Sequence, residues 1–317
     1  MAGVKRSLAV DLNGVGFPLP VLAASGCFGT GKELAGLVDL RRLGGIVTRS
    51  LTYNPTKGSP TPRVAESPSG IVTSVGIQNA GVHGFIAEDL PRLERTGLPI
   101  VVSLAGSSLE EYIRVASALE RRPGIVALEV YLSGADEERD GAPFYARIDR
   151  IGEVVGAVSR LSRFPVFAKL PALLPDLVEA ARACVRAGAH GLTLIDAVPG
   201  MVIDVGKLRP RLGSATGGLS GPAIRPIAVA AVFNVASAMP DVPIMGVGGI
   251  STGEDAVEFL LAGAWAVQVG TAMLVNPSAP MEIAQGILQY LKAKGLGSPA
   301  DLRGRLRLIR PVPGVGP

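Results

Sequence analysis

Short apolar runs alternate with helical patterns along the whole chain. The runs are rich in Val, Ile and Leu, and continuous apolar runs of this length are typical of strands that are buried on both faces of a parallel sheet. Eight such runs predict strands at residues 21–26, 44–52, 99–106, 125–133, 165–171, 191–197, 243–249 and 266–273.

The segments between these runs carry apolar residues at helical spacing. Clear examples are residues 108–121, 176–188 and 253–263, and the last two end on a glycine that can close a helix. Strands that alternate with helices predict parallel βαβ units. Eight units in a chain of 317 residues predict an α/β fold, a (β/α)8 TIM barrel, as a single domain over residues 1–317.

Three further segments do not follow this repeat. Residues 8–20 predict a β-hairpin that turns at Asn13-Gly14 and closes the N-terminal end of the barrel. Two connections, residues 53–82 and 198–222, are too long for simple crossovers and are rich in Pro, Gly, Ser and Thr. Both follow the carboxyl ends of strands, where a barrel binds its ligand, so we expect them to form long loops over the site.

Composition narrows the classes of function. Apolar residues make up 48% of the chain and charged residues 18%, which is enough for one large core. Two cysteines and two histidines argue against a disulfide framework and against a metal site, and they fit a reducing, cytoplasmic setting. No run is long enough for a membrane span, and no signal-peptide core follows Lys5 and Arg6.

The net charge of +4 does not predict nucleic-acid binding. The positive residues are scattered, and aromatic residues make up only 4% of the chain. Surfaces that bind nucleic acids combine clustered cations with aromatic rings that stack on bases. Residues 303–310, which alternate Arg with apolar residues, are expected to pack one face of a terminal segment, with a phosphate or partner contact as the alternative.

Two glycine-rich strand ends predict a phosphate site. Residues 246–252 (GVGGIST) end the seventh strand and open a helix, and residues 269–273 (VGTAM) end the eighth. Glycines let backbone N–H groups approach an anion, and the helix N-terminus adds its positive end. Tight turns without a ligand are the alternative. Lys169, in an apolar strand, either meets an anionic partner or extends outward from the strand end.

Five stretches carry a resemblance to one family: LAASGCFGTGKE, NPTKGSPTPRVAESPSG, VGIQNAGV, TGGLSGPAIRPIA and GVGGISTGEDAVEFLLAGAWAVQVGTAM. Together they resemble the catalytic subunit of class 1B dihydroorotate dehydrogenases, and the resemblance covers about residues 8–295. It implies a (β/α)8 barrel with FMN over the C-terminal face. It also implies a homodimer and an electron-transfer partner subunit that carries an iron–sulfur cluster and FAD.

The resemblance places most of the flavin site on matching residues. Arg49 and Ser103 stand where the family has lysine and asparagine. The implied FMN-binding residues are Ser25, Gly26, Arg49, Ser50, Ser103, Lys169, Ile195, Gly221, Gly248, Gly249, Gly270 and Thr271.

The substrate side departs from the family. The family signature Asn-x-Ser-Cys-Pro-Asn, whose Cys is the catalytic base, is here residues 131–136, YLSGAD, so Gly134 replaces the base. Tyr131 and Asp136 are the candidate catalytic residues, with a Tyr131 that only fills the pocket as the alternative. Ser133 is expected to point away from the flavin. The implied substrate residues are Arg49, Thr73, Gly76, Ile77, Tyr131, Asp196 and Ala197.

These departures lead to three functional hypotheses. The first is an FMN-dependent oxidoreductase that transfers hydride from a small substrate other than dihydroorotate to flavin N5, because carboxylates at Asp136 and Asp196 disfavour an anionic ligand. The second is a genuine dihydroorotate dehydrogenase of pyrimidine biosynthesis that uses an unusual base, and Cys27 is a further candidate for that role. The third is a flavin-binding or partner protein without turnover.

Overall fold

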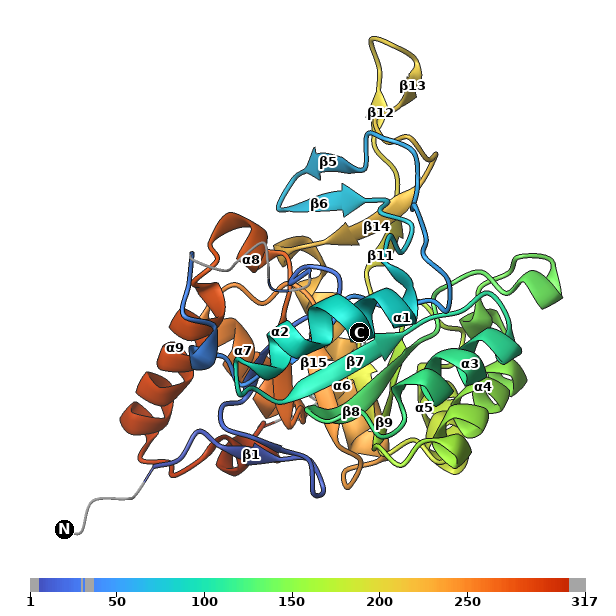
Figure 1. The fold of residues 1–317 in the computed structure, drawn as a ribbon. Helices are drawn as coiled ribbons and strands as arrows, with labels where there is room; N and C mark the ends of the chain where they lie inside the picture. The colour runs from blue at the N-terminus through green and yellow to red at the C-terminus, as the bar shows by residue number, and fades with distance from the viewer. Residues whose placement is uncertain (1–5, 30, 32–36, 308–317) are drawn as a thin grey trace, which may run out of the picture.

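Eight parallel strands form a closed barrel in the computed structural model, which describes residues 6–29, 31 and 37–307 (Figure 1). The strands are β3 (Val21–Ala23), β4 (Gly45–Val47), β7 (Ile100–Leu104), β8 (Ile125–Tyr131), β9 (Val166–Leu170), β10 (Gly191–Leu194), β15 (Ile244–Val247) and β16 (Ala266–Val269). Each begins within its predicted range and ends earlier than predicted. The predicted (β/α)8 barrel is confirmed.

Strand neighbours follow chain order around the barrel, and β16 pairs with β3 to close it. The N-terminal end is covered by the antiparallel hairpin of β1 (Val10–Asp11) and β2 (Gly16–Phe17). Its turn places Asn13 and Gly14 at positive φ. Leu12 is fully buried in the cluster that fills this end of the barrel. The predicted hairpin is confirmed.

Amphipathic helices surround the barrel. Three begin at residues whose side chains accept a hydrogen bond from the first turn, namely Ser108, Asp176 and Thr252. The longer helices are α3 (Leu109–Leu119), α4 (Ile148–Leu161), α5 (Leu177–Arg186), α6 (Arg225–Ala238), α7 (Gly253–Ala262) and α9 (Ala279–Lys294). The predicted helices at 108–121, 176–188 and 253–263 therefore form with slightly narrower bounds.

Short helical turns complete the connections. The short α-helices are α1 (Gly81–Gly84), α2 (Leu90–Glu94) and α8 (Ala272–Val275), and a π-helical turn, η2 (Phe85–Asp89), joins the first two. The 3-10 turns are η1 (Leu40–Arg42), η3 (Glu137–Arg139), η4 (Phe144–Ala146), η5 (Pro222–Ile224) and η6 (Pro299–Leu302).

The two long connections pair with each other in one small antiparallel sheet, with strand order β11-β14-β6-β5. Its strands are β5 (Val64–Ser67), β6 (Gly70–Thr73), β11 (Val198–Gly200) and β14 (Gly217–Ser220). The hairpin of β12 (Ile203–Asp204) and β13 (Arg209–Pro210) extends beyond this sheet at the top of Figure 1. The sequence predicted long loops here but not their pairing.

The structure also bears on the Arg-rich segment near the C-terminus, on membrane spans and on metal sites. Arg303 stacks on the Trp265 ring, with its guanidinium carbon 3.7 Å from the ring centroid, whereas residues 308–310 of the Arg-rich segment lie outside the described residues. Within the described ranges, no helix is long and apolar enough to cross a membrane. The same residues contain no group of three or more His, Cys, Asp or Glu side chains that could hold a metal ion.

Candidate functional site

A cavity of about 570 Å³ lies at the carboxyl ends of the barrel strands, under the sheet of the two long connections. This volume is typical of a site for a cofactor or small molecule. Most of the lining residues come directly after the barrel strands. The sequence had predicted most of these residues as parts of the strands, which end earlier in the structure. Thr73 and Gly217, from β6 and β14, line it from above.

All of the FMN-binding residues predicted from the sequence line this cavity except Ser103. Ser103 is fully buried in β7, and its hydroxyl lies 2.9 Å from the hydroxyl of Ser50, which does line the cavity. Ser103 therefore lies behind the cavity wall in this structure and supports Ser50, and its contact with the flavin stays a prediction.

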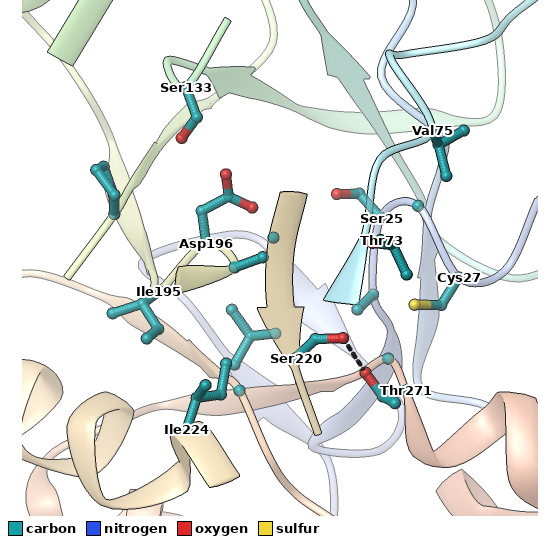
Figure 2. A pocket seen from close by; sticks show the side chains of 18 of the residues that line it. Ser25, Cys27, Thr73, Val75, Ser133, Ile195, Asp196, Ser220, Ile224 and Thr271 are labelled. Carbon is teal, nitrogen blue, oxygen red and sulfur yellow. Dashed lines mark hydrogen bonds between the residues drawn. The ribbon is translucent and has the colours of Figure 1, made fainter. Parts of the chain in front are cut away.

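Glycines form one wall of the cavity. Gly248 and Gly249 adopt positive φ values of 128° and 75°. A Cβ at Gly249 would lie 2.9 Å from the carbonyl oxygen of Gly221, so a side chain has no room there. The hydroxyls of Ser220 and Thr271, next to Gly221, form a hydrogen bond of 2.8 Å (Figure 2). Exposed backbone and two hydroxyls fit a phosphate group.

The N-terminus of α7 contributes less than the sequence suggested. The side chain of Asp255 accepts hydrogen bonds from the backbone N–H groups of Ser251 and Thr252, each at 2.9 Å. Asp255 also forms an ion pair with Arg225. These two backbone donors are therefore already engaged, and the predicted phosphate site rests mainly on the glycines and hydroxyls.

Lys169 lies inside the barrel mouth and is only 4% exposed. Its ammonium group lies 3.1 Å from the Ser25 hydroxyl and 3.8 Å from the Glu129 carboxylate. Glu129 is fully buried and also accepts hydrogen bonds from Thr193 at 2.9 Å and Gln268 at 3.0 Å. The alternative of an outward-pointing lysine is wrong. The sequence required an anionic partner but did not identify Glu129.

These groups fit a phosphorylated flavin. Two cations, Arg49 and Lys169, line a cavity whose described lining contains a single carboxylate, Asp196. The Ser25 and Ser50 hydroxyls add hydrogen-bonding groups at the ends of β3 and β4. An FMN held here would supply a hydride acceptor, and the residues named above would bind its phosphate and its ring.

The substrate residues predicted from the sequence also line this cavity. Tyr131 and Asp196 lie beside each other on its wall, and the negative charge of Asp196, followed by burial, holds the pKa of Tyr131 well above its usual value. The phenol therefore stays protonated. A Cβ at Gly134 would lie 3.6 Å from the Gly106 carbonyl oxygen and 4.0 Å from the Tyr131 ring, so a small side chain fits there.

Asp136 lies outside the cavity. It is 1% exposed, and its carboxylate binds Arg150 through Nε at 2.6 Å and Nη2 at 3.2 Å. Arg150 also pairs with Glu138 and Glu153. The prediction of a catalytic Asp136 is wrong in this structure, because that carboxylate holds the loop after β8 against α4.

Ser133 points into the cavity rather than away from it (Figure 2). Because β8 ends at Tyr131, Ser133 and Gly134 both lie beyond the strand, where the alternation of side chains that the prediction assumed no longer applies. Cys27 also lines the cavity, and burial raises the pKa of its thiol. Tyr145, from η4, was not predicted, and no local motif marks it.

Known proteins resemble the chain over nearly its full length. The sequence profile described as "Dihydroorotate dehydrogenase" matches residues 7–291. A Geotalea daltonii protein is 45% identical over 304 residues, which cover 96% of this chain and 99% of that protein. A Geobacillus kaustophilus protein is 43% identical over 298 residues, or 94% and 95% of the two chains. Both are named "Dihydroorotate dehydrogenase B (NAD(+)), catalytic subunit".

Proposed function

Because this chain belongs to the dihydroorotate dehydrogenase family, we propose that it is a flavin-dependent oxidoreductase that converts dihydroorotate to orotate. The sequence favoured an altered substrate and kept dihydroorotate as the alternative. A relative that is 45% identical over 96% of the chain and carries the name of dihydroorotate dehydrogenase supports the alternative instead.

Charge in the cavity supports the same choice. The case against an anionic substrate rested on two carboxylates, but Asp136 lies outside the cavity and is paired with Arg150. Asp196 remains, and a carboxylate can accept hydrogen bonds from the N–H groups of a dihydroorotate ring. Arg49 lines the cavity and can pair with the substrate carboxylate.

One cavity brings together the flavin and substrate positions that the resemblance implies, and this supports the proposal most strongly. Its residues come from seven barrel strands and from the sheet above them. FMN is the cofactor in this proposal. Ser25 and Lys169 would bind its ring, and the glycine wall with Ser220 and Thr271 would bind its phosphate.

Electrons must then leave the reduced flavin. The relatives are named as catalytic subunits of NAD(+) enzymes, which supports a partner subunit that passes electrons onward. We propose that this partner carries an iron–sulfur cluster and FAD, and that the chain forms a homodimer. Cys27 and Cys184 are both free thiols, as expected for a cytoplasmic enzyme.

One observation favours a second candidate, a related ring substrate that is neutral or cationic. Gly134 carries no side chain where the family has its base, and Asp196 and Tyr131 replace amides in the substrate shell. Such a substrate would not need Arg49 as a counter-ion.

The visible spectrum of the purified protein, with mass analysis of what denaturation releases, tests the cofactor. The proposal expects FMN. Addition of dihydroorotate without oxygen then separates the candidates, because bleaching of the flavin supports dihydroorotate. A flavin that is bleached only by other ring compounds supports the second candidate. A bound flavin that no such compound reduces means that the chain binds flavin without turnover.

A further inference from the structure

Dehydrogenation of a carbon–carbon bond removes one hydrogen as hydride and its neighbour as a proton, so the site needs a proton acceptor. Gly134 cannot supply one. We infer that Asp196 is this acceptor and acts directly on the substrate, with Tyr131 as a positioning residue beside it. This inference rests on the proposed dehydrogenase function.

The other titratable groups on the described cavity wall are poorly suited to accept a proton. Arg49 stays protonated. The ammonium group of Lys169 is already engaged with Ser25 at 3.1 Å and Glu129 at 3.8 Å. Burial raises the pKa of Cys27, which disfavours the thiolate that would act as a base. Tyr131 and Tyr145 also line the cavity; the raised pKa of Tyr131 keeps its phenol a hydrogen-bond donor, and Tyr145 offers a second phenol hydroxyl.

The position of Asp196 suits the role. It lies two residues after β10, where its backbone N–H donates to the Leu170 carbonyl at 3.1 Å and ties the residue to β9. Figure 2 shows its carboxylate pointing into the cavity, on the side from which the Ser133 hydroxyl projects. Of the residues that the structure describes, no Lys or Arg forms an ion pair with Asp196, in contrast to Asp136. The carboxylate of Asp196 therefore keeps oxygen lone pairs that can accept a proton from the substrate.

The step balances as follows. The bond between hydrogen and one ring carbon breaks, and its proton goes to a carboxylate oxygen of Asp196. The electron pair left on that carbon forms the ring double bond, while the hydrogen of the neighbouring carbon leaves with its electron pair to the oxidised flavin. The substrate loses two electrons and the flavin gains them. The protonated Asp196 then releases its proton to water.

The first test compares the flavin-loaded protein with its Asp196→Asn variant, in which an amide of the same shape cannot accept the proton. We expect reduction by dihydroorotate to slow by about 10²- to 10⁴-fold. We expect orotate affinity, measured by calorimetry, to change by less than about tenfold. Asp149→Asn, the same change in an exposed ion pair, is the control and should leave both values unaltered.

The outcomes separate the two proposals. An Asp196→Asn variant that is reduced as fast as the parent overturns only the role of Asp196. A parent with bound FMN that dihydroorotate does not reduce overturns the proposed function and, with it, this inference.

A second variant tests whether the function that Asp196→Asn loses is proton acceptance. The space beside Gly134 admits a thiol, because its Cβ would meet only ordinary contacts at 3.6 Å and beyond. Adding Gly134→Cys to Asp196→Asn should recover at least about tenfold in rate. No recovery, in a protein that still binds FMN and orotate normally, counts against Asp196 as the acceptor.

Discussion

Position 134 shows what a single residue can and cannot reveal. The sequence showed that glycine replaces the family's base at this position. It did not show which group could replace that base, because Asp196, which lines the same cavity, lies 62 positions later, after β10. Asp136 was predicted to be catalytic because the residues near it in sequence do not show its partner. That partner, Arg150, lies on a helix outside the local motif.

The coupling of Tyr131 to Asp196 can be measured without turnover. The carboxylate charge raises the pKa of the phenol, so Asp196→Asn should lower that pKa, while the smaller contribution of burial remains. The pH dependence of phenolate absorbance reports this, and Tyr131→Phe identifies the transition. A transition that stays in place in Asp196→Asn would show that the two groups do not interact.

Asp136 is predicted to be structural. Asp136→Asn leaves the buried Arg150 without its main partner, and removing one partner of a buried pair costs roughly 3 kcal/mol in the free energy of unfolding. Denaturant unfolding measures this loss. The folded variant should keep its orotate affinity. A stable Asp136→Asn protein that no longer reduces its flavin would restore the catalytic role expected from the sequence.

At the scale of elements, the barrel strands and main helices were predictable because each depends on local apolar spacing and on caps such as Ser108. The sheet over the cavity was not, because it pairs Thr73 with Gly218 across the barrel. The predicted barrel strands also extended beyond the ends that the structure shows. Residues such as Ser133 and Asp196 follow the observed strand ends and line the cavity.

The N-terminal hairpin is predicted to stabilise the barrel by packing. Leu12 is fully buried in the cluster that fills the barrel's N-terminal end. Leu12→Ala should lower the free energy of unfolding by about 2–5 kcal/mol. Leu208→Ala, at a residue that is 88% exposed, is the control and should change it by less than about 0.5 kcal/mol. Equal effects of the two substitutions would mean that the hairpin adds no packing energy.

At the scale of the whole molecule, the cavity is assembled by topology. Arg49 follows β4, Lys169 lies in β9, and Gly248 and Gly249 of the glycine wall follow β15. A parallel barrel brings these strand ends to one face whatever their separation in sequence. The resemblance could therefore name many of the cavity residues, whereas the buried partner Glu129 became apparent only from the folded arrangement.

We propose that this cavity oxidises dihydroorotate with a bound flavin. The most direct test of this proposal is anaerobic titration of the FMN-loaded protein with dihydroorotate, with the product identified by mass. We expect the flavin to be fully reduced with one orotate formed for each FMN. A protein that retains FMN yet stays oxidised, and forms no orotate, would contradict the account.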